Sequence, residues 1–133
     1  MPYPYLAGQE TPFPGLPIVI INRKTGSQTG VFDVMIDTGA DATLVPVQVL
    51  RSIGATMPRR TARLRSLWGE YRQVQVILVD MDIAGERLAA VEVVADDRGE
   101  DILLGRNVLN KLILLLDGPN KQTDLLKRRP RRV

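Results

Sequence analysis

Apolar residues lie along this chain in short continuous or alternating runs, which turn-forming residues separate. The runs are rich in Val, Ile and Leu, which favour strands. They cover residues 17–22, 31–36, 42–46, 62–67, 71–83, 87–95, 101–104, 112–117 and 122–126. Residues 47–54, between Pro46 and Gly54, and residues 106–111 predict short helices. The pattern predicts an all-β domain, a small closed barrel or a sandwich, with one or two short helices.

The two ends of the chain differ in composition from the part between them. Five of the nine prolines lie within residues 1–17, so we expect residues 1–16 to form a proline-rich arm that is extended rather than packed. Residues 17–126 have the length and the pattern of one domain. Residues 127–133, KRRPRRV, form a basic tail that accounts for the net charge of +3.

This basic tail could contact nucleic acid or an anionic surface, but short runs of like charge usually stay solvated. We expect a solvated tail and no nucleic-acid contact. No apolar run approaches the roughly 18 residues of a membrane span. The first residues also lack the basic start and apolar stretch of a signal peptide. We therefore expect a cytoplasmic protein without membrane contact.

Two missing residue types narrow the possible chemistry. The chain has no cysteine and no histidine. Disulfides, a thiolate nucleophile, Ser-His catalysis and histidine metal sites are therefore excluded. We expect neither a metal nor a cofactor.

One carboxylate interrupts the most apolar part of the sequence. Asp37 lies within VFDVMIDTGADATLVP, residues 31–46, between two runs suited to interior strands. Asp-Thr-Gly alone is a good turn sequence, in which the aspartate caps the turn and the glycine takes a positive φ. An aspartate near a core loses hydration, however, and such carboxylates usually have a partner or a task. Asp37 is therefore a candidate catalytic group.

The chemistry that remains open to a lone Asp37 needs a second carboxylate. Two close carboxylates share one proton and can activate a water between them for peptide hydrolysis. The chain has no second Asp-Thr-Gly and no Asp-Ser-Gly. A two-fold homodimer would bring the same residue from each chain to the axis.

Two motifs together resemble the retroviral-type aspartic proteases, the retropepsins. The first is DTGAD, residues 37–41, with Thr43 after it, and the second is ILLGRN, residues 102–107. Retropepsins are all-β homodimers with one catalytic aspartate per chain. The resemblance implies a homodimeric aspartic endopeptidase that cleaves extended peptides. The alternative is a dimerisation or binding module that keeps this fold with weak or no catalysis.

The resemblance also implies roles for individual residues of the two motifs. Asp37 would be the catalytic carboxylate. Thr38 would form a hydrogen bond across the dimer axis, and Gly39 would let the backbone approach the water and the substrate. Asp41 would lie at the edge of the cleft and form an ion pair with Arg106, whose planar guanidinium suits a carboxylate.

Ala40 is a departure from the pattern of many relatives, which have Ser or Thr at this position of the catalytic loop. Their hydroxyl donates to the catalytic carboxylate and favours its charged form. Alanine has no donor, so we expect a pH window of activity less acidic than that of a relative with serine.

The flap and the C-terminal end also differ from the viral pattern. Retropepsin flaps are usually glycine-rich, whereas the candidate tip here, Leu67-Trp68-Gly69, has one glycine. Trp68 either reaches over the substrate or packs on the domain surface. Residues 112–126 predict a full hairpin, as in cellular Ddi1-type protease domains. We therefore expect the dimer interface to use this hairpin rather than an interleaved N-terminal strand, because proline weakens ladder pairing.

Overall fold

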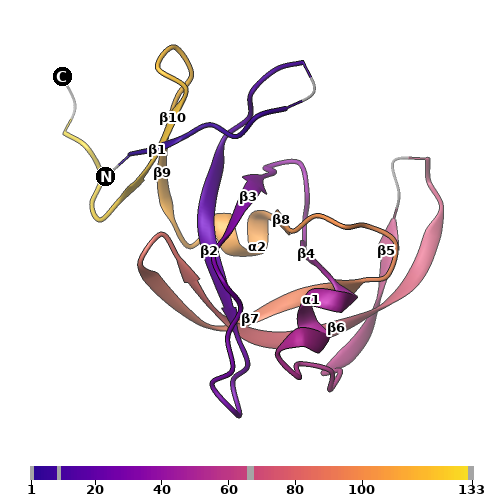
Figure 1. The fold of residues 1–133 in the computed structure, drawn as a ribbon. Coiled ribbons are helices and arrows are strands. Elements are labelled where there is room, and N and C mark those ends of the chain that lie inside the picture. Colours follow the sequence, from indigo (N-terminus) through magenta and orange to yellow (C-terminus); the bar gives the residue numbers. More distant parts are fainter. Residues whose placement is uncertain (1, 9, 66–67, 132–133) are drawn as a thin grey trace.

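The computed structural model describes residues 2–8, 10–65 and 68–131, which form a closed β-barrel with attached hairpins (Figure 1). The barrel strands are β2 (Gly15–Ile21), β3 (Phe32–Ile36), β4 (Thr43–Pro46), β6 (Tyr71–Ile83), β7 (Glu86–Asp96) and β8 (Leu103–Leu104). They are hydrogen-bonded in the order β2-β3-β8-β4-β7-β6, and β6 pairs back with β2. The predicted all-β closed fold is therefore confirmed.

The remaining elements attach to this ring. β5 (Arg60–Arg65) pairs with β6 and forms a hairpin that extends from the barrel. α1 (Val47–Ser52) follows β4, with Pro46 as its N-cap. Gly54, just past its end, has a φ of +70°, a conformation that favours glycine. α2 (Arg106–Leu109) is a single turn after β8.

The barrel interior is filled by aliphatic side chains from alternate strand positions. Ile18 and Ile20 of β2 are at most 1% exposed, as are Val79, Met81 and Ile83 of β6. Successive side chains of a strand point to opposite faces, which explains the period of two in the sequence. Each buried side chain of this size stabilises the fold by about 1.5–3 kcal/mol. The barrel therefore supports its loops rigidly.

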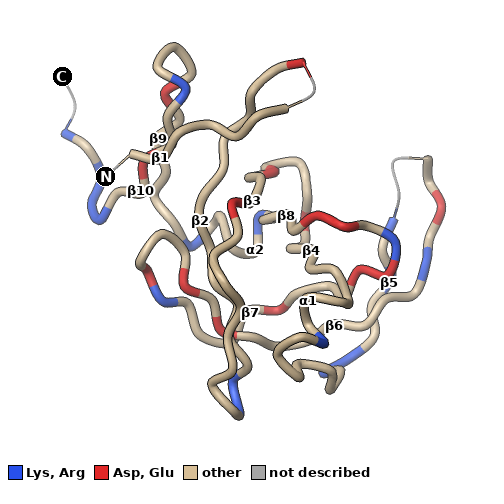
Figure 2. Tube along the Cα trace, viewed as in Figure 1, with Lys and Arg blue, Asp and Glu red and all other residues tan. Residues whose placement is uncertain are grey.

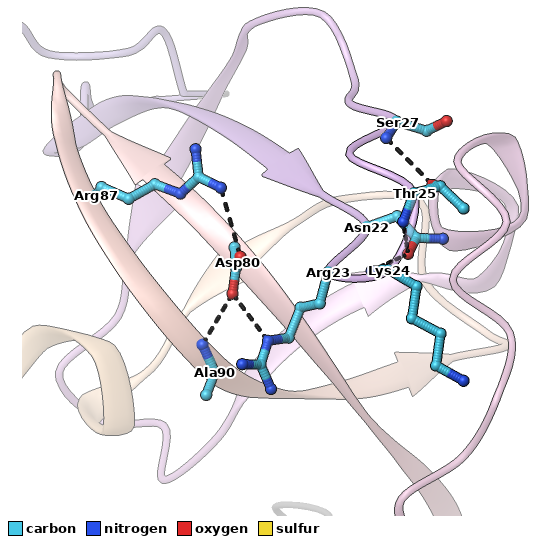
Figure 3. A network of polar contacts seen from close by, with 8 residues as sticks. All are labelled: Asn22, Arg23, Lys24, Thr25, Ser27, Asp80, Arg87 and Ala90. Atoms are coloured by element: carbon cyan, nitrogen blue, oxygen red, sulfur yellow. Dashed lines mark hydrogen bonds and ion pairs between the residues drawn. The ribbon is translucent and has the colours of Figure 1, made fainter.

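A β-bulge in β7 is held by Asp80 of β6 (Figure 3). Ala90, in the bulge, has a φ of +57°, which costs a non-glycine residue roughly 1–2 kcal/mol. Asp80 accepts a hydrogen bond from the Ala90 amide at 3.0 Å and forms ion pairs with Arg23 at 3.1 Å and Arg87 at 3.4 Å. The amide contact is the main reason that the pKa of Asp80 lies below its usual value.

A second sheet of three strands lies beside the barrel, on the side away from the β5–β6 hairpin (Figure 1). Its order is β1 (Pro2–Pro4), β10 (Gln122–Leu126), β9 (Ile113–Asp117). β9 and β10 form the predicted C-terminal hairpin. Side chains from this sheet, including Tyr3 and Leu114, pack against the barrel core.

The expectation that the proline-rich arm stays unpacked is wrong for β1, which pairs antiparallel with β10. The register explains how prolines are accommodated. The Tyr5 amide donates to the Lys121 carbonyl at 2.8 Å, so the hydrogen-bonded positions of this ladder fall on odd-numbered residues of the arm. Pro2 and Pro4 occupy the positions between them, where the ladder needs no N–H.

Helices are few in this fold, and none within the described residues is long and apolar enough to span a bilayer.

Candidate active site

Asp37 begins the loop that joins β3 to β4. Its amide donates to the Leu104 carbonyl of β8 at 2.9 Å, which continues the parallel pairing of β3 with β8. Its Oδ1 accepts the Gly39 amide at 2.9 Å and closes a turn. The flanking Ile36 and Val45 are buried, but Asp37 itself is only half-buried in the single chain. The apolar runs suggested a position nearer the core, which is wrong because the loop turns out of the barrel into a cleft.

The glycine of the first motif lies close to the Asp37 carboxylate and does not have a positive φ. Gly39 does not adopt the left-handed conformation, so this part of the turn prediction is wrong. A Cβ at this position would lie 3.2 Å from Oδ1 of Asp37, which is tighter than most real Cβ contacts. A side chain would therefore crowd the carboxylate oxygen that the Gly39 amide binds.

The second motif packs its backbone directly against this loop. A Cβ on Gly105 would lie 2.2 Å from the carbonyl oxygen and 2.4 Å from the carbonyl carbon of Ala42. The Arg106 amide donates to the Ala40 carbonyl at 2.8 Å. Only glycine permits this approach, so the two motifs form one unit.

Hydrogen bonds of Thr43 and Asn107 connect the two motifs beneath the loop. The hydroxyl of Thr43, a fully buried residue, accepts the Gly105 amide at 3.1 Å and donates to Asn107 Oδ1 at 2.8 Å. The Asn107 amide group then donates to the Glu92 carbonyl of β7 at 2.8 Å. These hydrogen bonds connect the start of β4 to the second motif and the second motif to β7. A network in which every buried polar group has a partner favours a single arrangement of its side chains. The motifs alone assign no role to Asn107, although it belongs to the second motif.

Arg106 reaches back from α2 over the loop of residues 37–42, which joins β3 to β4. Its Nη1 donates to the Thr38 carbonyl at 2.9 Å, and its Nη2 forms an ion pair with Oδ1 of Asp41. The structure thus contains the ion pair that the resemblance implies. The Asp41 side chain is 89% exposed, so this pair contributes little to stability. Its consequence is geometric, because one guanidinium holds both sides of the loop.

The loop forms one side of an open cleft of about 650 Å³. Asp37 and Asp41 line it, together with Asn107. The apolar part of the surface comes from β4, β5, β6, β7 and β8, through Leu44, Ala62, Leu64, Val74, Val76, Val93, Val94 and Leu103. The charged side chains of Arg60, Arg63 and Arg65 on β5 and of Glu92 on β7 also line the cleft. A carboxylate therefore lies in a largely apolar groove that is open to solvent.

An ion pair between Arg60 of β5 and Glu92 of β7 lines the cleft. Arg60 contacts the two carboxylate oxygens of Glu92 at 2.9 and 3.3 Å. This hydrogen bonding, with the charges of Arg60 and Arg59, holds the pKa of Glu92 below its usual value. The partners are 32 residues apart, and the sequence offers no local signal for this contact.

The β5–β6 hairpin supplies the other side of the cleft, where a flap is expected. Of the candidate tip, Leu67 lies outside the described residues. Trp68 is 90% exposed in the single chain, so its ring does not belong to the barrel core. Gly69 has a φ of +83°, which explains the single glycine of this turn. Arg63 of β5 stacks on the ring of Tyr71 at 4.4 Å.

Within the part of the chain that the structure describes, no group of three or more acidic, histidine or cysteine side chains is placed to hold a metal.

Comparison with known families bears on this site. A sequence model of the family described as "gag-polyprotein putative aspartyl protease" matches residues 25–111. The matched part contains both motifs, the hairpin of β5 and β6, and α2, and it is more than half of the chain. Among curated protein sequences, no significant match is found.

Solved structures with the same fold include viral and cellular proteins. The protease of simian foamy virus (mac) has a TM-score of 0.51 and 24% identity, over 73% of this chain and 92% of that protein. The EIAV protease, in complex with the inhibitor HBY-793, has a TM-score of 0.53 and 16% identity, over 80% and 93%. For the retroviral protease-like domain of Ddi1 from Leishmania major the values are 0.50 and 15%, over 84% and 92%. At these identities the likeness shows a shared fold.

Proposed function

The chain belongs to the gag-polyprotein aspartyl protease family, and we propose that it is an aspartic endopeptidase whose active site is completed by a second copy of the chain. The observation that carries this proposal is the setting of Asp37. It lies in a cleft, on a loop that Gly105 and Arg106 hold from the second motif and that Thr43, at the start of β4, joins to that motif. Such a rigid setting is what a reacting carboxylate needs.

In the proposed reaction, two Asp37 carboxylates, one from each chain, share one proton because both cannot ionise at close range. The charged carboxylate takes a proton from a water held between them. The neutral one donates its proton to the oxygen of the peptide carbonyl. The water oxygen bonds to the carbonyl carbon and forms a diol intermediate. The carboxyl that took the water's proton then gives it to the peptide nitrogen as the C–N bond breaks, and the diol returns a proton to the other carboxylate. No covalent bond to the protein forms.

The other residues of the loop support this reaction in the same proposal. Thr38 is exposed in the single chain, so its side chain is available for a hydrogen bond across the two-fold axis. Gly39 leaves room at the reacting carboxylate. Asp41, braced by Arg106, lies at the cleft edge where a substrate backbone would pass.

The proposed substrate is an extended peptide with apolar residues at the cut. The apolar walls from β4, β5, β6 and β8 suit such side chains. An extended peptide also presents side chains alternately to the two sides of a groove. For dimerisation we propose the outer face of the sheet β1-β10-β9, where Leu115 is 49% exposed.

The experiment is cleavage of an unstructured protein by the purified chain between pH 3 and 7. We expect the wild type to cut and Asp37→Ala not to cut, and pepstatin-like inhibitors to block the reaction. The matched control is Asp33→Ala, which changes an exposed aspartate of the same segment and should leave cleavage intact. Equal cleavage by Asp37→Ala would contradict the proposal, and a wild type without activity would favour the alternative of a binding module.

A further inference from the structure

The β5–β6 hairpin is supported by the barrel over only part of its length. β6 pairs with β7 from Gln75, opposite Ala95, onward. Within the described residues, the four positions before it, residues 71–74, pair with β5 alone. A two-stranded ribbon has little stability of its own. Another contact is therefore needed to fix the hairpin over the cleft.

Arg72 makes such a contact, three residues beyond the last pair of β6 with β7. Its Nη1 is 2.8 Å from Oδ1 of Asp97, and its Nη2 is 3.3 Å from Oδ1 of Asp96. These two aspartates directly follow Ala95, where β7 leaves the hairpin. One guanidinium thus bridges the unsupported part of the hairpin to the end of β7. Figure 2 shows the acidic residues of the segment after β7 lying beside this hairpin.

Asp96 is well placed to act as a fixed anchor. Its side chain is 7% exposed, and it accepts the Arg98 amide at 3.0 Å. A Cβ on Gly99 would lie 2.4 Å from its Oδ2, so the segment folds tightly around the carboxylate. Burial alone would raise the pKa of Asp96, but the amides of Arg98 and Gly99 together with Arg72 outweigh it and hold that pKa below its usual value.

The same segment continues directly into the second motif. Residues 97–102 lead into β8, where Leu104 accepts the Asp37 amide and Gly105 packs on the catalytic loop. On the hairpin side, Arg72 lies on the same face of β6 as Val74, which lines the cleft. The contact of Arg72 with Asp96 therefore joins the two sides of the cleft.

We propose that Arg72 is a positioning residue, which sets the place of the β5–β6 hairpin relative to the catalytic loop through Asp96. The inference rests on the proposed protease function for its consequence, which is the fit of a substrate in the cleft. Exposed ion pairs contribute little to stability. This one differs because Asp96 is buried and accepts the Arg98 amide, whereas the second partner of the guanidinium, Asp97, is 72% exposed.

The test is hydrogen exchange, which needs no activity. In Arg72→Gln, amides of residues 61–65 and 71–74 should exchange roughly tenfold faster, because local opening loses a charge-assisted contact, while amides of β2 and β4 keep the wild-type rates. The anisotropy of Trp68, the only tryptophan, should fall as the hairpin gains freedom. Unchanged exchange in the hairpin, or equal acceleration in the barrel, would overturn the proposal.

Two further variants sharpen the test. Arg60→Gln removes the same charge and a similar two-oxygen contact at the base of the hairpin, where β6 already pairs with β7. Its hairpin amides should exchange as in the wild type. Asp96→Asn should reproduce most of the effect of Arg72→Gln, and the double variant should add little to Arg72→Gln, because both changes break the contact between Arg72 and Asp96. Fully additive effects would contradict a shared contact.

Kinetics then separate positioning from the proposed function itself. For Arg72→Gln we expect KM for a peptide substrate to rise several-fold with kcat within about twofold, whereas a loss of folded protein would lower the rate and leave KM unchanged. An unchanged KM beside faster exchange would overturn the role in substrate fit. A wild type without activity would contradict the proposed function and leave the exchange result standing.

Discussion

At the residue scale, the candidate site depends on a backbone contact without room for a side chain. In Gly105→Ala the new Cβ would meet the Ala42 carbonyl at 2.2 Å. Backbone atoms cannot move aside as a flexible side chain can, so the two motifs would separate. We expect a loss of about 2–3 kcal/mol in the free energy of unfolding, in the range of overpacked cores. Urea denaturation measures it.

The matched control for this substitution is Gly118→Ala. Gly118 has open space around the position of a Cβ and no positive φ, so the same change should stay within about 0.5 kcal/mol of the wild type. Equal effects of the two substitutions would show that the close approach of Gly105 to Ala42 is not a determinant of stability.

Ala40 carries a second prediction at this scale. A serine at position 40 would place a hydroxyl donor in the loop that carries Asp37, and a donor favours the charged form of a carboxylate. The acid limb of the pH–rate profile of Ala40→Ser should therefore move to lower pH than in the wild type. An Ala40→Val variant, which is larger but has no donor, should not show this shift. A profile that does not move in Ala40→Ser would count against the interpretation of Ala40.

At the scale of elements, the Asp80 network (Figure 3) links the β7 bulge to pH. The folded-state pKa of Asp80 is lowered, chiefly by the Ala90 amide. Its stabilisation is therefore complete above the unfolded value of about 3.9 and is lost as pH falls through the folded value. The urea midpoint of Asp80→Asn should lie below that of the wild type at pH 7. The difference between the two midpoints should become smaller below pH 4.

Other carboxylates also make the stability depend on pH, so the stability of Asp80→Asn should still fall in acid. Glu92 and Asp96 also have lowered pKa values, so Asp80→Asn should keep part of the acid destabilisation. Asp33→Asn, which removes an exposed carboxylate, should follow the wild-type curve. A constant difference between wild type and Asp80→Asn from pH 7 to pH 2.5 would contradict a role for the charge.

The strands could be predicted from the sequence, because each one is a run of apolar or alternating residues that turn-forming residues bound. β6 begins at Tyr71 and ends at Ile83, as the pattern indicates. The β1 ladder could not be predicted in the same way. Proline discourages pairing in general, and only the register with β10 shows that Pro2 and Pro4 avoid the bonding positions.

The candidate site also has features that the sequence predicts and features that only the structure shows. Each of the two motifs is a short continuous stretch of sequence, so Asp37 and Arg106 could be identified from the sequence alone. Contacts between distant positions, such as Arg72 with Asp96 and Arg60 with Glu92, have no local signature. The space requirement of Gly39 was also hidden, because a glycine looks the same in sequence whether it supplies a positive φ or leaves room for a neighbour.

At the scale of the whole molecule, the single chain holds half of the proposed site, so activity should depend on association. The outer face of the small sheet carries Ile113, Leu115 and Leu126, which its register places on one side together with Asp117 and Asp124. In a monomer these apolar side chains would remain partly exposed to solvent, and adjacent exposed apolar side chains often mark an interaction site. We therefore expect this face to lie in the dimer interface.

Leu115→Lys tests this arrangement. A lysine in an apolar interface would have to lose its hydration, so the dimer should dissociate at least tenfold more readily in sedimentation experiments. Because each active site needs two chains, activity per chain should fall and should recover as the protein concentration rises. Met57→Lys, at a 74% exposed position between α1 and β5, should remain dimeric and active. A Leu115→Lys variant that keeps both the dimer and full activity would place the interface elsewhere.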